Sequence, residues 1–273
     1  MRTRVRRAVF VGASLAIVGV VAVGALVVTG RPGGQVACGF RSATVSCTRV
    51  LFIGNSYTYA NDLPGTFAEL ARAGGHEVET GMLASGGATL ADHAADAATM
   101  QRLGSSRWDH VVLQEQSEIP AIRGVRAQQM YPAARSLVGD VRATGARPML
   151  LVTWAHRDGW PENGLPNYAA MQDGIDAGYG SIARELAVPE APVGYVWAQV
   201  RRDHPEVDLW QADGSHPSVS GTYLAACVLY ASIFRQRPPD STYPADLSGA
   251  TAAALRQSAA ALVLADPAAW GLR

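Results

Sequence analysis

Short apolar runs alternate with longer segments of helical pattern from Arg49 onward, and this alternation limits the fold more than any other feature. The runs have the length and residue types of strands, whereas the segments between them repeat apolar residues at helical spacing. Strands that alternate with helices form a parallel sheet covered on both faces. The sequence therefore predicts an α/β fold, a three-layer α/β/α domain with a doubly wound, five-stranded parallel sheet.

The elements can be placed on the sequence. The predicted strands are VLFI, VETGML, HVVLQ, PMLLVT and VGYVW. The predicted helices include LPGTFAELARAGG, QQMYPAARSLVGDVRATG and MQDGIDAGYGSIARELA. No internal repeat, low-complexity tract or second linker follows Gly34, so residues 49–273 are expected to form one domain.

The N-terminus has the pattern of an export signal or a membrane anchor. Four arginines precede an apolar run at residues 8–28, about the length that a helix needs to cross a bilayer. They outnumber Arg31 after the run, so the positive-inside rule places the residues beyond Gly30 outside the cytoplasm. Residues 1–30 are expected to be a signal peptide or a transmembrane anchor, and both remain open.

Export changes what the three cysteines predict. Cys38 and Cys47 lie in or beside a short stem, residues 31–48, and a disulfide between them is expected in an oxidising compartment. Two free thiols in the stem are the alternative. Cys227 lies in the apolar stretch YLAACVLY and is expected to be a buried, inert thiol.

The first predicted strand ends abruptly in the polar turn Gly54-Asn55-Ser56. In a doubly wound sheet, ligands bind at the carboxyl ends of the strands. A serine at that edge can lie near backbone N–H groups that point at a developing negative charge. Ser56 is therefore a candidate nucleophile, and the alternative is that it only caps the next helix.

A serine hydroxyl is a weak nucleophile and needs a base. Among six histidines, only His216 stands in a setting that also supplies a carboxylate, because Asp213 precedes it by three residues in DGSH. The turn between them can fold Asp213 onto Nδ1 of His216, which leaves Nε2 free to take the proton of Ser56. The alternative is that Asp213 and Ser215 cap the following helix while His216 lies on the surface.

Taken together, the two segments resemble a known family. FIGNSYT is similar to the first block of the SGNH (GDSL-like) hydrolases, and DGSH is similar to the Asp-x-x-His of their last block. The order of the blocks also agrees, and the resemblance covers about residues 49–234. The resemblance implies the flavodoxin-like sheet of the SGNH hydrolase fold. It also implies a serine ester hydrolase with Ser56 as nucleophile, His216 as base and Asp213 as its orienting partner.

The resemblance also implies an oxyanion hole. In that family the hole consists of the nucleophile's own N–H, here Ser56, a glycine N–H of the second block and an asparagine side chain of the third. The second block maps onto LASGGATL, where Gly86 is preferred over Gly87 as the donor.

The third block departs from the Gly-x-Asn-Asp of the family, because VVLQEQSEIP follows the third strand. Aligned on the strand end, Gln116 takes the asparagine position, and its amide is a comparable donor. Gln114 is the alternative donor, and Glu115 is expected either to orient Gln116 or to face water. The departure indicates a divergent branch related to SGNH carbohydrate esterases.

A long polar loop, TWAHRDGWPENGLPNY, follows the fourth strand, and loops of this kind often shape substrate access. Trp154 and His156 are candidate substrate-binding residues, together with Asn55 and Gln114 near the nucleophile. The alternative is that Trp154 packs inward and His156 only forms a local hydrogen bond.

Other kinds of site find little support. The histidines and cysteines lack the spacing of zinc ligands, and Gly81, Gly86 and Gly87 do not form a dinucleotide-binding turn. Acidic and basic residues number 23 each, so no excess charge attracts nucleic acid. Contact with a membrane is expected only through the N-terminal segment, if it is not cleaved.

The sequence thus predicts an exported serine esterase that acts on O-acyl esters, with acetyl as the expected acyl group, on a carbohydrate or cell-envelope substrate. The proposed chemistry needs neither a metal nor a cofactor. An O-acyltransferase with the same triad and a non-catalytic glycan-binding domain of the same fold are the alternatives.

Overall fold

A computed structural model of the 273-residue chain describes residue 38 and residues 46–240 and 246–272. The predicted signal or anchor, residues 1–30, and most of the predicted stem lie outside the described residues. No helix in the described ranges is both long and apolar enough to cross a membrane.

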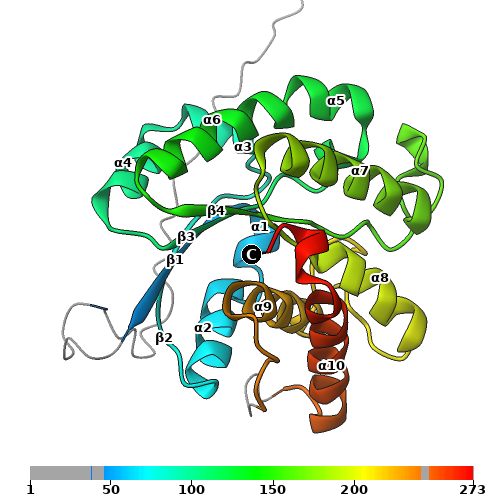
Figure 1. Cartoon of the computed structure of the whole chain (residues 1–273). Coiled ribbons are helices and arrows are strands. Elements are labelled where there is room, and N and C mark those ends of the chain that lie inside the picture. Colours follow the sequence, from blue (N-terminus) through cyan, green and yellow to red (C-terminus); the bar gives the residue numbers. More distant parts are fainter. Residues whose placement is uncertain (1–37, 39–45, 241–245, 273) are drawn as a thin grey trace, which may run out of the picture.

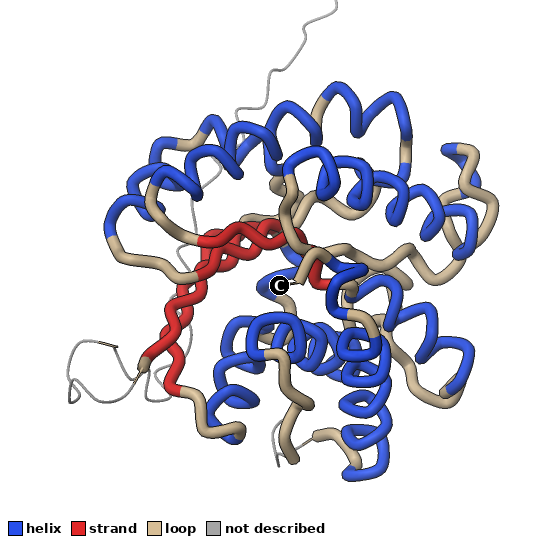
Figure 2. Tube along the Cα trace, viewed as in Figure 1, coloured by secondary structure: helices blue, strands red, loops and turns tan. Residues whose placement is uncertain are grey.

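Five parallel strands form one sheet in the order β2-β1-β3-β4-β5 (Figures 1 and 2). The strands are β1 (Cys47–Gly54), β2 (Glu77–Ala84), β3 (His110–Leu113), β4 (Arg147–Leu151) and β5 (Glu190–Ala191). The predicted doubly wound, flavodoxin-like sheet is therefore confirmed. The order of the strands reverses between β1 and β3, and such a point is where ligands bind in sheets of this kind.

Helices cover both faces of the sheet (Figure 1). One layer contains α3 (Leu90–Ala95), α4 (Ala97–Ser105), α5 (Arg123–Gln128), α6 (Met130–Ala143) and α7 (Tyr168–Leu186). The other contains α2 (Leu63–Ala73), α8 (Val193–Asp203), α9 (Val219–Phe234) and α10 (Gly249–Ala265). The short helix α1 (Ser56–Tyr59) lies directly after β1.

The helix α2 illustrates how the sequence sets these elements. Asp62 caps it, since its side chain accepts a hydrogen bond from the N–H of Gly65, and a proline stands in the first turn. Its apolar residues Leu63, Phe67 and Leu70 recur at helical spacing and are fully or almost fully buried. The helix therefore presents one apolar face to the sheet and to α9.

The prediction of the fifth strand at VGYVW is wrong. β5 consists of Glu190–Ala191, and Val193–Trp197 forms the first turns of α8 after Pro192. The buried residues of α8 include Val193, Val196 and Val200, a spacing of a helix and not of a strand. A short apolar run with an aromatic residue fits both patterns, and the packing of its neighbours decides between them.

One cluster of buried apolar side chains includes both Val50 in β1 and Leu272 beyond α10, so the described residues share a single core. The helix α9 is buried almost all round and carries Cys227. Burial raises the pKa of the Cys227 thiol, so it stays protonated and unreactive. The predicted inert thiol is therefore confirmed.

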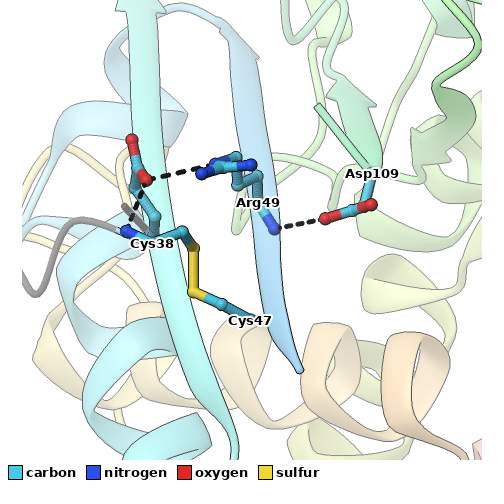
Figure 3. The surroundings of a disulfide bond; sticks show 5 residues. Cys38, Cys47, Arg49 and Asp109 are labelled. Atoms are coloured by element: carbon cyan, nitrogen blue, oxygen red, sulfur yellow. Dashed lines mark hydrogen bonds and ion pairs between the residues drawn. A yellow bond between two sulfur atoms is a disulfide. The ribbon is translucent and has the colours of Figure 1, made fainter. Parts of the chain in front are cut away.

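The predicted disulfide between Cys38 and Cys47 is present at the start of β1 (Figure 3). The N–H of Cys38 donates a hydrogen bond of 3.0 Å to Glu79 in β2, and Arg49 lies 3.3 Å from the same carboxylate. The N–H of Arg49 donates to Asp109, before β3. The disulfide therefore anchors Cys38 to the amino end of the sheet, which is the end opposite the turn that follows β1.

Two carboxyl groups with raised pKa values lie on neighbouring elements, the half-buried Asp176 on α7 and the buried Glu190 on β5. Burial raises the pKa of Asp176 to about 7, and the charge of Asp173 acts in the same direction. Burial also raises the pKa of Glu190 to about 7, with a further contribution from Asp176. Both acids therefore hold their protons in the folded protein at a pH where the unfolded chain has lost them.

This difference predicts a pH dependence of stability. A carboxyl with a raised pKa stabilises the fold fully at low pH, and that stability is lost as the pH rises from about 4.5 through about 7. Relative to wild type, Asp176→Asn with Glu190→Gln should gain unfolding free energy on the order of 1 kcal/mol per group between about pH 5 and pH 8. Denaturant unfolding at both pH values measures this, with the exposed Glu162→Gln as control. A difference from wild type that does not change with pH would contradict the assignment.

Candidate active site

The turn after β1 is held in place from three sides. The chain packs so closely at Gly54 that a Cβ there would collide with the side chains of Gln114 and Thr58. The carbonyl of Gly54 is within 2.7 Å of Nε2 of His93 in α3. The amide oxygen of Gln114 accepts hydrogen bonds from the N–H of Asn55 and the hydroxyl of Thr58. These contacts, from Gln114 after β3 and from His93 in α3, fix the position of Ser56.

Ser56 is the first residue of α1, and Asn55 is its N-cap. The side chain of Asn55 accepts a 3.0 Å hydrogen bond from the N–H of Tyr57. The alternative that Ser56 only caps the helix is therefore wrong, and its hydroxyl is available for other partners.

The structure brings Ser56, His216 and Asp213 together in one hydrogen-bonded chain. Nε2 of His216 lies 2.9 Å from Oγ of Ser56, and Nδ1 of His216 lies 2.6 Å from Oδ2 of Asp213. Residues 160 positions apart in the sequence thus meet at hydrogen-bonding distance. Because α9 has Ser218 as its N-cap, the alternative that Asp213 and Ser215 cap this helix is wrong.

The negative charge of Asp213 fixes the tautomer of His216. Burial acts to raise the pKa of Asp213, but hydrogen bonds from the N–H of Ser215 and from His216 outweigh it and lower the pKa below its usual value. Asp213 is therefore a carboxylate at neutral pH and accepts the proton on Nδ1. The lone pair on Nε2 then faces the Ser56 hydroxyl, which is the arrangement that makes a histidine a general base.

The loop that carries Asp213 and His216 is held by backbone contacts. The N–H of Gln211 donates to the carbonyl of His216 at 2.8 Å, and the N–H of Arg157 donates to the carbonyl of Gly214 at 2.7 Å. Arg157 also forms an ion pair with Asp208 at the start of the loop. The guanidinium of Arg157 therefore helps to hold the loop, through Asp208 and the carbonyl of Gln211.

A stack of aromatic rings underlies His216. Tyr57 stacks on Trp154 with ring centroids 4.6 Å apart, and Trp154 stacks on Trp197 at 4.1 Å. The indole N–H of Trp154 donates to the carbonyl of Ser215, beside His216. Trp154 is only 1% exposed, so the prediction that it binds substrate is wrong and the alternative of inward packing is confirmed.

Tyr57 links the nucleophile to the loop of the base. Its hydroxyl lies 2.7 Å from Oγ of Ser215, and its ring contacts His216 edge-on. Burial raises the pKa of Tyr57, so the hydroxyl keeps its proton. Tyr57 was not among the predicted site residues, although its place directly after Ser56 was a signal that could have found it.

The second block forms the loop between β2 and α3. Gly86 is exposed in this loop, and Gly87 takes a positive φ of 70°, a conformation that favours glycine. The side-chain amide of Asn55 donates to the carbonyl of Ala88 and so fixes the loop beside the nucleophile. The role of Gly86 as a donor to the oxyanion stays a prediction.

The side-chain amides of the third block differ in how fully their hydrogen bonds are used. The side-chain oxygen of Gln116 accepts hydrogen bonds from the N–H groups of Glu118 and Ile119, which turns its NH₂ group the other way. Within the described part of the chain, that NH₂ group has only long contacts of 3.4 Å, to Ser117 and Glu118. Gln116 therefore retains a donor that is weakly used, and its role in the oxyanion hole stays a prediction.

Two other predicted site residues are structural. Asn55 is 2% exposed and Gln114 is 1% exposed. The NH₂ group of Gln114 donates to Oδ1 of Asn55 and to the carbonyl of Glu115, so it has no donor left for an oxyanion or a substrate. The predictions that Gln114 is an alternative donor and that either residue binds substrate are therefore wrong.

His156 lies half-buried in the loop after β4. Burial lowers its pKa, while the charges of Glu118 and Asp213 act in the opposite direction. His156 is therefore neutral at pH 7, and its Nε2 has no hydrogen-bond partner among the described residues. Its predicted contact with substrate stays a prediction.

Metal ligation has no support in the ranges that the structure describes, because no group of three His, Cys, Asp or Glu side chains is arranged to hold an ion. The chain of Asp213, His216 and Ser56 can instead activate a hydroxyl directly, which is the chemistry of acyl transfer through a serine.

Comparison with solved structures identifies the family. The chain is 33% identical to a candidate SGNH hydrolase from Slackia heliotrinireducens, with a TM-score of 0.59 and an alignment that covers 67% of this chain and 97% of that protein. The chain belongs to the SGNH hydrolases. It is therefore a serine ester hydrolase by family.

More distant structures share the fold. A DUF4886 family protein from Bacteroides uniformis has a TM-score of 0.70 at 20% identity, with 81% of this chain and 96% of that chain covered. The acetylxylan esterase Axe2 from Geobacillus stearothermophilus has a TM-score of 0.53 at 16% identity, with 68% and 94% covered. No protein-family model and no curated protein matches the chain.

The bond between Tyr57 and Ser215 can be tested by a double-mutant cycle. Tyr57→Phe and Ser215→Ala should each lower kcat for p-nitrophenyl acetate about threefold to tenfold, because each loosens the loop that positions His216. The double variant should lose no more than Tyr57→Phe alone, since Tyr57→Phe already removes the bond that Ser215→Ala removes. Tyr230→Phe, which removes a buried hydroxyl away from the site, is the control. Fully additive losses would contradict a direct coupling.

Proposed function

We propose that the chain is an exported serine esterase that hydrolyses O-acyl esters, chiefly acetyl esters, of a carbohydrate or cell-envelope substrate. The observation that carries the proposal is the hydrogen-bonded chain in which Asp213 orients His216 and His216 contacts the Ser56 hydroxyl at 2.9 Å. Membership of the SGNH hydrolases supports the reaction class.

In the acylation step, Oγ of Ser56 attacks the ester carbonyl carbon while Nε2 of His216 takes the hydroxyl proton. The tetrahedral intermediate carries its negative charge on the former carbonyl oxygen. When the C–O bond to the alcohol breaks, His216 returns the proton to the leaving oxygen, and the acyl group remains on Ser56. Asp213 stabilises the imidazolium that forms in between.

In the second half, a water molecule loses a proton to His216 and attacks the acyl-enzyme carbonyl. The bond to Ser56 then breaks, Oγ recovers its proton from His216, and the acid leaves. In both halves the oxyanion would be held by the N–H groups of Ser56 and Gly86 and by the side-chain NH₂ of Gln116.

The surroundings of the triad support a neutral acyl group. Glu118 lies close enough for its charge to act on Tyr57 and His156, and the charge of Asp213 acts on the same two residues. Two carboxylates disfavour a substrate that carries its own carboxylate near the scissile bond. An acetyl group carries no charge, so an acetyl ester is compatible with these two carboxylates.

A sugar substrate is supported by Tyr59. Tyr59 is the one exposed side chain among the large apolar residues in the described ranges, with 39% of its surface accessible. It lies three residues beyond Ser56, and its hydroxyl is 3.4 Å from the position that a Cβ on Gly86 would occupy. An exposed aromatic ring beside the proposed hole suits stacking on the apolar face of a sugar. One fold relative is named an acetylxylan esterase, which agrees with this class.

Export is supported by the apolar N-terminal segment and by the Cys38–Cys47 disulfide, since disulfides persist mainly in oxidising compartments. The catalytic domain would then act outside the cytoplasm, either released or attached to the membrane through residues 1–30.

Removal of the nucleophile or the base tests the proposal. With residues 31–273, which retain the Cys38–Cys47 disulfide, and p-nitrophenyl acetate as substrate, Ser56→Ala and His216→Ala should each lower kcat by roughly 10⁴-fold or more, because either change breaks the same catalytic unit. Ser218→Ala, which removes a helix cap beyond the triad, is the control for a nearby serine. Turnover that survives Ser56→Ala would contradict the assignment. A large rate increase on adding a sugar acceptor, with acylated sugar as the product, would favour the acyltransferase instead.

The sugar platform predicts a change in selectivity. Tyr59→Ala should lower kcat/KM for an acetylated xylo-oligosaccharide about fivefold more than for p-nitrophenyl acetate, because about 1 kcal/mol of stacking is lost with the sugar only. Tyr59→Phe keeps the ring and should stay near wild-type selectivity. Equal losses on the two substrates after Tyr59→Ala would exclude a sugar contact at this position.

A further inference from the structure

Glu115, directly after the Gln114 that follows β3, has no exposed surface. One oxygen of its carboxyl, Oε1, accepts hydrogen bonds from two backbone N–H groups, of Leu90 at 3.1 Å and of Gln116 at 2.7 Å. Its own N–H donates to the hydroxyl of Tyr179 in α7 at 3.0 Å. The expectation that Glu115 might face water is therefore wrong.

The two N–H groups belong to different blocks of the site. Leu90 is the first residue of α3 and follows the loop that contains Gly86. Gln116 belongs to the third block. A single carboxyl oxygen thus ties together the two loops to which the proposed function assigns the second and third oxyanion donors.

The free-energy cost of burying the Glu115 carboxyl argues against a role limited to filling space in the core. Burial raises the pKa of Glu115 to about 7, against the two hydrogen bonds, which lower it. The other oxygen, Oε2, is buried and has no hydrogen-bond partner among the described residues. A buried acid with hydrogen-bond partners on one oxygen only is unfavourable for the fold, and such groups gather at functional sites.

We propose that Glu115 is the positioning residue of the oxyanion hole. Its Oε1 fixes the spacing between the Gly86 loop and Gln116, so that both donors meet the oxyanion at the same time. The inference rests on the proposed function, because that function is what makes Gly86 and Gln116 donors to an oxyanion. Glu115 itself takes no part in the chemistry.

A positioning role has a kinetic signature. The charge on the oxyanion develops in the transition state, so displaced donors lower kcat and leave substrate binding almost unchanged. A misplacement of about 1 Å is enough for a loss on the order of 10²-fold. A role confined to stability would lower the thermal midpoint without this separation of kcat from KM.

Two substitutions of Glu115 separate its hydrogen bonds from its bulk. Glu115→Leu fills the space but accepts no hydrogen bond, and it should lower kcat for p-nitrophenyl acetate on the order of 10²-fold with KM within about threefold. Glu115→Gln keeps an acceptor oxygen, so its kcat should be much closer to that of wild type than the kcat of Glu115→Leu is. Fluorophosphonate labelling should still occur in both variants, at a reduced rate after Glu115→Leu.

A matched pair at Leu90 tests the same contact without changing Glu115. Leu90 is the first residue of its helix, where proline is tolerated, and Thr89 before it is extended, as a residue before proline must be. Leu90→Pro removes the N–H that Glu115 accepts, whereas Leu90→Ala keeps it. Both lose the buried leucine side chain. Leu90→Pro should therefore have a kcat at least tenfold below that of Leu90→Ala, and this pair decides the question if Glu115→Leu fails to fold.

The outcomes distinguish this inference from the function on which it rests. No turnover by wild type with any ester would overturn the proposed function and this inference with it. An active wild type, an inactive Ser56→Ala variant and a Glu115→Leu variant with wild-type kcat would overturn the inference alone. Equal kcat in Leu90→Pro and Leu90→Ala, or a loss in KM instead of kcat, would overturn it as well.

Discussion

Two reciprocal hydrogen bonds between Asn55 and Gln114 connect the carboxyl ends of β1 and β3, and the site depends on them. The N–H of Asn55 donates to the amide oxygen of Gln114 at 3.0 Å, and the amide of Gln114 donates back to Oδ1 of Asn55 at 3.0 Å. The same Asn55 side chain caps α1 and reaches the loop of Gly86. Because both residues are buried, these bonds are strong and costly to break. They orient Ser56 before any substrate arrives.

The polar third block divides its work among neighbouring residues. Gln114 fixes the turn of the nucleophile, Glu115 joins two loops, and Gln116 keeps a weakly used NH₂ group. Gln114 and Glu115 are buried, and their polar groups have partners in α3, α7 and the turn after β1. Much of this part of the site is therefore held by buried hydrogen bonds.

Much of this arrangement could be predicted from the sequence. Asp213 and His216 are close in the chain, so their contact depends on one local turn, and Ser56 follows a strand whose place in the fold sets its edge. The alternation of strands and helices likewise specified the sheet, because each pattern is local. These features need no knowledge of what packs against what.

The errors have a common physical cause. The run VGYVW was assigned to a strand because its helical face becomes visible only when α8 is packed. Asn55, Gln114 and Trp154 were assigned to substrate because polar and aromatic residues at a strand edge are usually exposed, and here they are buried. The bridge through Glu115 joins residues 25 positions apart, and no spacing in the sequence announces it. Burial and long-range pairing are properties of the packed chain.

The most direct test of the account is to locate the covalent adduct of a fluorophosphonate by peptide mass spectrometry. The account predicts one phosphonyl group, on Oγ of Ser56, with labelling slowed strongly by His216→Ala because the base that activates the hydroxyl is gone. A folded protein with no adduct, or an adduct on another residue, would contradict the central claim that Asp213, His216 and Ser56 form the catalytic unit.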